Sequence, residues 1–156
     1  MYTCQSMAKV IGEIARKNHL DLHRVGSHIK LENPPYMLLS IGVIGPNLVS
    51  VCHCRERNHN RMRGPEMVFL TGDHFSWIPV SFHNDYTRTY RVATIVSNGI
   101  CLAYYETEQK EEAAFADLWA GSLIEQGFLD QRHDPVVVQA RVGPYVFRDL
   151  AVVRHL

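Results

Sequence analysis

The fold is decided by residues 49–82, which read VSVCHCRERNHNRMRGPEMVFLTGDHFSWIPVSF. Three β-prone segments follow one another here, over residues 48–55, 66–71 and 75–82. An arginine-rich connection, residues 55–63, joins the first two, and Gly72-Asp73 turns between the second and the third. Short successive strands with polar connections indicate an antiparallel sheet. Pro79 lies inside the third segment, where it predicts an edge strand or a bulge.

More strands are predicted on both sides of this stretch. Residues 36–44 form a mostly apolar run that indicates a central strand, and Gly45-Pro46-Asn47 forms a turn after it. Residues 90–97 and 100–105 flank Asn98-Gly99. Because a type I′ turn needs a positive φ at both central residues, Asn-Gly between two β-prone runs predicts a hairpin.

Helices are predicted before and after the strands. Residues 3–18 carry apolar side chains at helical spacing, and a second helix is predicted from about residue 107 to Gly127. The apolar positions are Met7, Val10, Ile11 and Ile14 in the first helix and Phe115, Leu118, Trp119 and Leu123 in the second. We therefore predict an α+β fold: an antiparallel sheet of five or six strands, with an N-terminal helix and a helix of the C-terminal half packed on one face.

Length and composition are those of one ordinary domain. The chain has 156 residues, with 16 basic and 16 acidic side chains, so no overall charge attracts it to nucleic acid or membrane. We expect a single domain over residues 1–156, with residues 130–156 forming a tail that is compatible with strand or helix. Neither a signal peptide nor a membrane-spanning run is recognisable, so a cytoplasmic protein with reduced cysteines is expected.

Short motifs in the middle of the chain match a known pattern. Residues 65–69 read PEMVF, residues 77–80 read WIPV and residues 126–128 read QGF. Residues 36–129 resemble a small bacterial domain family of unknown function, found on chromosomes, plasmids and phages. Its pattern is a histidine at a strand end, Asp-Pro-Glu-Met-x-Phe, Trp-x-Pro-Val and a helix closing on Gln-Gly-Phe. The matching positions are His53, Pro65, Glu66, Met67, Phe69, Trp77, Pro79, Asp85, Trp119, Gln126, Gly127 and Phe128.

The sequence departs from that family at three places. Gly64 stands where the family has an acidic residue, Cys54 stands where it has an aromatic one, and arginines replace a polar loop. The resemblance implies the fold and an origin on a mobile genetic element, with an accessory or counter-defence role as one consequence. It implies no activity.

Metal binding is suggested by the triplet Cys52-His53-Cys54, with His59 as a fourth ligand. Alternation along a strand places the two cysteines on one face and the histidine on the other, and no second cysteine pair with zinc-site spacing exists. We therefore expect two buried thiols, a hydrogen-bonded histidine and no metal. No motif for a cofactor is present either.

An acid–base site would need His53 to meet Glu66 and Asp85 across the sheet. The sequence offers no nucleophile in a recognisable setting, so these three residues are candidates for catalysis while a structural hydrogen-bonded pair is the preferred interpretation. We do not expect an enzyme. A hydrolase that uses His53 and Glu66 stays as an alternative.

The arginine-rich connection is the strongest candidate for a binding surface. Arginine suits phosphate and carboxylate groups, and loops commonly carry function. The candidate binding residues are Arg55, Arg57, His59, Arg61, Arg63 and Trp77. We predict a binding module for a protein partner, with nucleic acid as the alternative ligand. A homodimer follows if a sheet edge stays unpaired.

Overall fold

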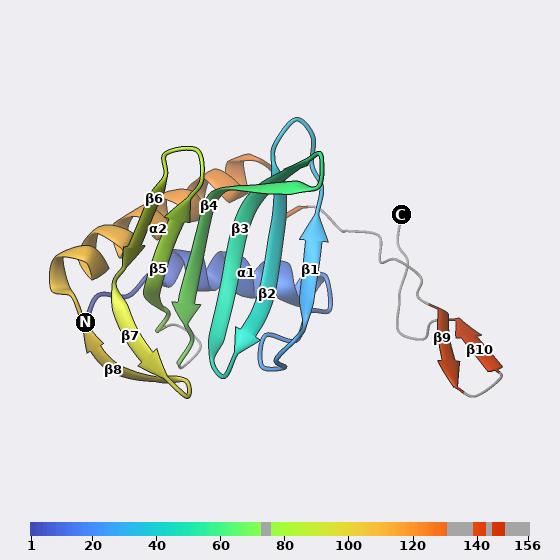
Figure 1. The fold of residues 1–156 in the computed structure, drawn as a ribbon, viewed down its shortest axis with the longest axis horizontal. Helices are drawn as coiled ribbons and strands as arrows, with labels where there is room; N and C mark the ends of the chain where they lie inside the picture. Colours follow the sequence, from blue (N-terminus) through green and yellow to red (C-terminus); the bar gives the residue numbers. More distant parts are fainter. Residues whose placement is uncertain (73–75, 131–138, 143–144, 149–156) are drawn as a thin grey trace.

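A six-stranded antiparallel sheet forms the centre of the molecule (Figure 1). The computed structural model describes residues 1–72, 76–130, 139–142 and 145–148. Strands that follow one another in sequence lie side by side, in the order β1-β2-β3-β4-β5-β6. Their bounds are β1 (His28–Leu31), β2 (Leu38–Gly45), β3 (Leu48–Arg57), β4 (Asn60–Leu70), β5 (Ile78–Asn84) and β6 (Thr89–Val92).

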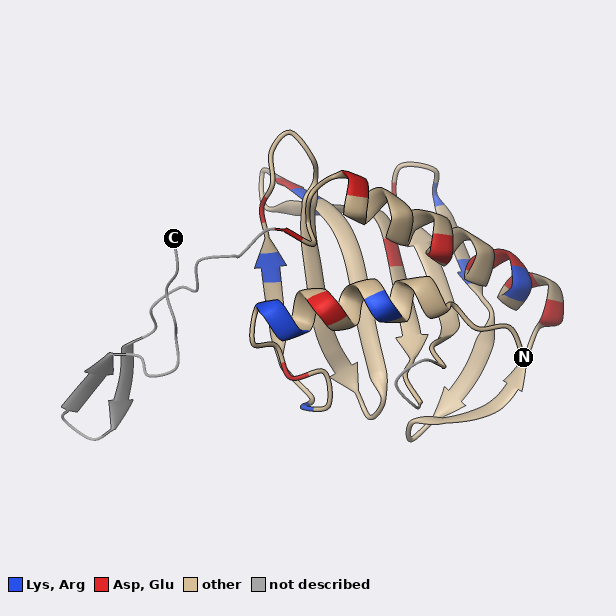
Figure 2. Ribbon diagram, turned by 180° about the vertical axis from the view of Figure 1, so that it is seen from behind, with Lys and Arg blue, Asp and Glu red and all other residues tan. Residues whose placement is uncertain are grey.

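Two helices, α1 (Gln5–Lys17) and α2 (Glu106–Glu125), lie across the same face of this sheet (Figures 1 and 2). The main hydrophobic core lies between the helices and the sheet, because the buried residues of α1, β2, β3 and β4 form one cluster with Trp119, Leu123 and Phe128. Among the residues that the structure describes, no helix lies on the other face of the sheet, which we call the helix-free face. The predicted α+β class, with both helices on one face, is confirmed.

The predicted apolar positions of α1 are confirmed, while those of α2 are only partly right. Met7, Val10, Ile11 and Ile14 are all buried. In α2, Trp119 and Leu123 are buried, but Leu118 is 75% exposed and Phe115 is also exposed. Helix α2 places alanines against the core instead, namely Ala113, Ala116 and Ala120. Small side chains at these positions allow a close approach between helix and sheet.

The connection predicted over residues 55–63 is not a loop. Strand β3 continues to Arg57 and β4 begins at Asn60, so only Asn58 and His59 form the turn. Both turn residues have positive φ values, 51° and 66°, as a type I′ turn requires. These strand ends extend past the part of the sheet that the helices cover. Polar side chains are therefore suitable there. We call residues 55–62 the arm. It bends over the helix-free face toward β1 (Figure 1).

A separate hairpin follows β6. Strands β7 (Thr94–Ser97) and β8 (Ile100–Tyr104) pair with each other, and Asn98-Gly99 forms their turn with φ values of 51° and 74°. The predicted hairpin is thus confirmed, although Ala93 divides the expected strand 90–97 in two. Val68 pairs with Ser81 and Phe69 with Pro79, so Val80 of β5 is the extra residue of a bulge beside Pro79. The bulge interpretation is confirmed, and the edge interpretation is wrong because β5 lies between β4 and β6.

Part of the tail adopts strand structure. Strands β9 (Gln139–Val142) and β10 (Tyr145–Arg148) form an antiparallel pair, and the rest of residues 131–156 lies outside the described residues. Within the described part of the chain, no helix is long and apolar enough to cross a membrane.

Candidate functional site

A row of polar side chains crosses the helix-free face of the sheet. Met67 and Phe82 are paired neighbours on β4 and β5 that face the helices, so the residues before and after them in their strands face the other way. The paired positions of this row are Lys30, Ser40, Cys52, Glu66, His83 and Tyr90, one from each strand of the sheet.

Arg63 gathers the acidic residues near this row into one hydrogen-bonded group. Its backbone N and its Nε both donate to Asp85 Oδ2, at 2.8 and 3.1 Å. Its Nη1 donates to Glu66 Oε1 at 3.2 Å, and Ser50 Oγ donates to Glu66 Oε2 at 2.9 Å. We call Arg63, Glu66, His83 and Asp85 the base network, because they lie where the arm leaves the sheet.

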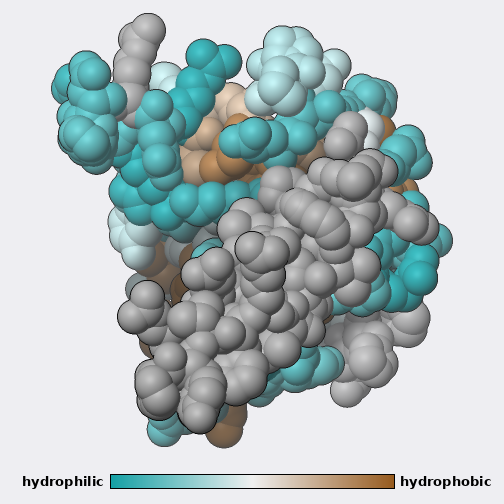
Figure 3. Space-filling view, turned by 90° about the vertical axis from the view of Figure 1, so that its right-hand side faces the viewer, coloured by the Kyte–Doolittle hydropathy of each residue, from teal (hydrophilic) through white to brown (hydrophobic). Residues whose placement is uncertain are grey.

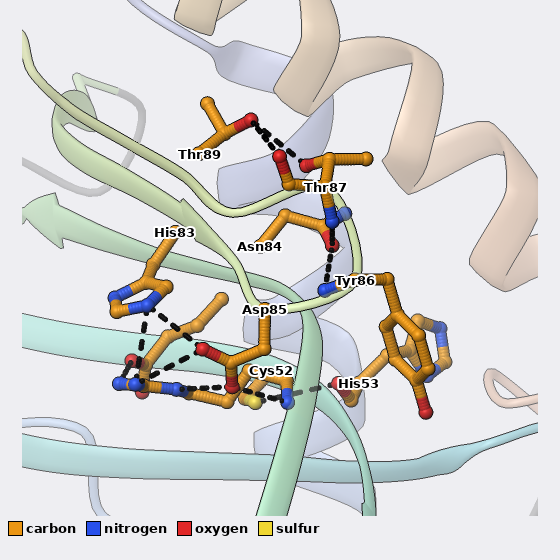
Figure 4. A network of polar contacts seen from close by, with 10 residues as sticks. Cys52, His53, His83, Asn84, Asp85, Tyr86, Thr87 and Thr89 are labelled. Atoms are coloured by element: carbon orange, nitrogen blue, oxygen red, sulfur yellow. Dashed lines mark hydrogen bonds and ion pairs between the residues drawn. The ribbon is translucent and has the colours of Figure 1, made fainter.

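His83 lies between a hydrogen-bond acceptor, the Asp85 carboxylate, and a hydrogen-bond donor, the Arg63 guanidinium. Its Nε2 is 3.0 Å from Asp85 Oδ1 and 3.1 Å from Arg63 Nη2 (Figure 4). The ring can donate to the carboxylate when Nε2 carries a proton, or accept from the guanidinium when it does not, but it cannot do both. Hydrogen bonds from Arg63 lower the pKa of Asp85 to about 2, and the Asp85 carboxylate raises the pKa of Arg63. Arg63 and Asp85 therefore both stay ionised at neutral pH.

His53 does not join Glu66 and Asp85, so neither the candidate acid–base group nor the preferred structural pair of His53 with Glu66 is formed. Its ring is buried against Trp119 and Phe128 on the helix-covered face, with ring centroids 5.5 and 5.6 Å away. Figure 4 shows it apart from the Asp85 carboxylate. Because the Met37 carbonyl can only accept, His53 Nδ1 donates to it at 3.2 Å. Burial lowers the pKa of His53, which is thus a neutral core residue. The histidine of the polar group is His83.

The Cys52-His53-Cys54 triplet does not converge on one point either. Both thiols are free and buried, as predicted, and both interact with the Arg61 guanidinium on the helix-free face. Burial raises the pKa of Cys52 to about 12, which makes it an inert neutral thiol. Among the described residues, no three His, Cys, Asp or Glu side chains gather as a metal site would require.

Not all arginines of the predicted connection, residues 55–63, are available to bind a ligand. Arg63 belongs to the base network, while Arg55, His59 and Arg61 are exposed on the arm. Arg57 ends β3. The one acidic residue of the arm, Glu56, lies 3.5 Å from Lys30 of β1, which ties the arm to the sheet edge. Trp77, a predicted binding residue, is instead buried in the core against Phe69, so that prediction is wrong.

A cleft of about 940 Å³ lies between the arm and the connection from β1 to β2. Leu38 and Cys54, neighbours on β2 and β3, line it together with residues of three connections. These are Pro34, Pro35, Tyr36 and Met37 from the β1–β2 connection, Met62 from the arm and Tyr86 from the β5–β6 turn. Figure 3, which looks at the molecule from the β1 side, shows hydrophobic surface at the top between hydrophilic side chains.

Both walls of the cleft are anchored to the body of the protein. On one wall, Met37 accepts a hydrogen bond from buried His53, and Asn33 Nδ2 donates to the Gln126 carbonyl at the end of α2. On the other wall, Tyr86 packs directly over Gly64, and the base network joins Arg63 to the β5–β6 turn. These contacts fix both walls to the sheet and to the end of α2.

Sequence reasoning missed His83 and the β1–β2 connection. The signal for His83 was its place two residues before Asp85 at the end of a predicted strand, a spacing that puts both side chains on one side of an extended chain. The double proline, Pro34-Pro35, marked a rigid connection, but only strand register shows that it lies opposite the arm.

Together, the fold and the cleft define a small α+β domain with an anchored surface cleft. The chain belongs to the DUF6908 family, a domain of unknown function, whose model matches residues 5–129. This match includes α1 and so begins earlier than the expected residues 36–129. No curated protein and no solved structure matches the chain.

Proposed function

We propose that this protein is a non-enzymatic binding module that holds an extended segment of a partner protein in the cleft between the arm and the β1–β2 connection. The observation that carries this proposal is the cleft itself, about 940 Å³ in volume, whose lining includes two prolines, two methionines and two tyrosines beside balanced charged residues. This volume falls in the range of sites that hold ligands, and it has room for a few residues of a chain.

The character of the lining favours a peptide over a polyanion. Tyr36 and Tyr86 line the cleft with both rings exposed, and tyrosine is common in protein-binding sites because it joins apolar area to one polar group. The charged residues of the lining balance one another, with Lys30 and Arg55 against Glu32 and Glu56, so the cleft carries no net charge. Anchored walls also reduce the entropy lost on binding.

The base network supports a structural role for the acidic residues. Both carboxylate oxygens of Glu66 and both of Asp85 accept hydrogen bonds or lie against His83. A general base needs a free oxygen within reach of a substrate proton. A hydrolase that used His53 with Glu66 would need side chains from opposite faces of the sheet.

Nucleic acid is the other ligand that the arm would suit, through Arg55 and Arg61, and it is an outcome of the test below. Such binding would weaken steeply with added salt, whereas the binding of a peptide in a cleft without net charge would respond weakly. A role in a mobile genetic element, as an accessory or counter-defence protein, stays a prediction from the resemblance.

The test is a selection of peptides from a random library on the immobilised full chain, followed by fluorescence anisotropy with a selected peptide. Tyr86→Ala should weaken binding by about tenfold or more, since it removes an aromatic anchor. The matched control is Tyr90→Ala, because Tyr90 is 65% exposed and Tyr86 54% exposed, but Tyr90 lies outside the cleft.

Two outcomes would contradict the proposal. One is the failure of any peptide to be selected while single-stranded DNA or RNA binds with steep salt dependence. The other is a selected peptide whose affinity drops equally with Tyr86→Ala and Tyr90→Ala, which would place the ligand elsewhere on the sheet.

A further inference from the structure

Strand β8 forms an exposed apolar edge at the opposite end of the molecule from the cleft. Its five residues read ICLAY and include no charged side chain. Ile100 is 63% exposed and Leu102 is 64% exposed, and Tyr104 and the following Tyr105 are exposed as well. In the part of the chain that the structure describes, β8 pairs with β7 alone, so its outer side has no neighbouring strand.

The edge at β1 shows how this protein protects a strand that is open to solvent. Strand β1 reads HIKL, and its Lys30 also interacts with Glu56 of the arm. Charged residues, and lysine above all, are a common defence of an edge strand against pairing with another chain. Strand β8 has neither lysine nor proline, and it offers five residues of uncharged edge.

Leu102 marks the centre of this edge. The register of β7 and β8 shifts here, because Ala103 lies opposite Ile95 and Cys101 opposite Val96, which leaves Leu102 without a cross-strand partner. An unpaired residue of this kind often turns an edge away from partners. Here it instead presents an apolar side chain to solvent, flanked by Ile100 and Tyr104.

We propose that β8 is the interface of a homodimer, in which the β8 edges of two copies pack antiparallel about a twofold axis near Leu102. An uncharged strand fits a partner that also lacks charge, and a second copy supplies that surface without like-charge repulsion. The axis would place Leu102 of one copy beside Leu102 of the other, and Ile100 of each beside Tyr104 of the other.

This arrangement closes after two copies, because both use the same surface. It also leaves the two clefts free at the far ends of the dimer, since β1 and β8 lie at opposite ends of the molecule (Figure 1). The proposal does not depend on what the clefts bind.

Analytical ultracentrifugation of the full chain over a wide range of concentration tests this interface. We expect a dimer for the wild type and a dissociation constant at least about tenfold weaker for Leu102→Lys, since a buried lysine would be unpaired. Leu118→Lys is the matched control: Leu118 is 75% exposed on α2, so the same change away from β8 should leave the dimer intact.

A second measurement applies if Leu102→Lys does not fold. With Cys101 changed to Ser, Leu102→Cys should form a disulfide-linked dimer under diamide, while Leu118→Cys in the same background should not. The proposal is overturned by a wild type that stays monomeric at the highest concentration, by a dimer that Leu102→Lys does not weaken, or by equal cross-linking of both cysteine variants.

Discussion

The guanidinium of Arg63 and the carboxylate of Asp85 join the base of the arm to the β5–β6 turn. Three donors of Arg63, its backbone N, Nε and Nη2, reach the two carboxylate oxygens at 2.8 to 3.4 Å. In return, the backbone N of Asp85 donates to the Arg63 carbonyl at 2.8 Å. Two connections that are distant in sequence are thereby fixed beside each other, and one wall of the cleft depends on both.

Asp85→Asn should therefore destabilise the protein. The substitution keeps the size of the side chain and removes the charge that Arg63 binds, so we expect a loss of about 1 to 2 kcal/mol in the free energy of unfolding. Urea unfolding followed by circular dichroism measures it. Asp130→Asn, at an exposed site after α2, is the control and should change little.

The effect of Asp85→Asn should also depend on pH. The folded-state pKa of Asp85 is about 2, below its ordinary value of 3.8, so the carboxylate contributes stability that is fully present above pH 3.8. This contribution is lost as the pH falls toward 2. The wild type and the variant should differ most at neutral pH and converge in acid. A constant difference across this range would contradict the assignment.

The contribution of Glu112 in α2 to stability should change with pH in the opposite direction. It is buried, and neither carboxylate oxygen has a hydrogen-bond partner among the described residues. Burial raises its pKa to about 7, with Glu108 and Glu111 adding to this and Arg91 opposing it. The folded protein therefore holds this proton more tightly than the unfolded chain. The associated stability is fully present below pH 4.5 and is lost as the pH rises to about 7.

Glu112→Gln should accordingly stabilise the protein above pH 7, by an amount on the order of 2 kcal/mol, and should leave it unchanged below pH 4.5. Thermal unfolding across this pH range measures the difference. Glu106→Gln, an exposed glutamate in the first turn of α2, should show no such pH-dependent gain. Destabilisation by Glu112→Gln at pH 8 would show that Glu112 has a charged partner.

Gly64→Ala tests the contact between the arm base and the cleft. A Cβ atom at this position would lie 2.7 Å from Cδ2 and 2.9 Å from Cε2 of Tyr86, so the ring must move away. We expect weaker binding of a selected peptide and a loss of about 1 kcal/mol of stability.

The double variant separates this contact from a backbone effect. If the clash with Tyr86 is the cause, Gly64→Ala should cost less stability when Tyr86 is already alanine. An equal cost in both backgrounds would instead attribute the effect to the chain at Gly64 itself.

Gly12→Ala should stabilise α1. Gly12 lies inside the helix, and an added Cβ would meet nothing within 4 Å. Alanine is favoured over glycine in a helix interior by about 0.5 to 1 kcal/mol, chiefly because the unfolded chain loses freedom. A rise in melting temperature without any change in peptide affinity is the expected result.

The fold could be predicted from the sequence because its elements are locally encoded. Each of three signals determines structure within a few residues of itself. They are the apolar spacing in α1, Asn98-Gly99 in the hairpin and Gly127 at the end of α2. The backbone N of Phe128 donates to the Leu123 carbonyl at 3.1 Å, and Gly127 has a φ of 82°, so the helix ends in the glycine cap that the sequence indicates.

The site was harder to predict because it depends on register between distant strands. Residues 55–63 are charged, which is typical of loops, yet they continue two strands past the helix-covered part of the sheet. His53 and Glu66 are close in sequence, but strand alternation places them on opposite faces. Tyr36, Met62 and Tyr86 line the cleft together, and no spacing in the sequence predicts that these three residues lie close in space.

The most direct test of the binding proposal is an amide NMR titration of the full chain with a selected peptide. We expect the chemical shift changes to concentrate in the β1–β2 connection, the arm and the β5–β6 turn, with those of Met37, Met62 and Tyr86 among the largest. Changes centred on Tyr90 or on the exposed side of α2, with those three residues unaffected, would contradict it.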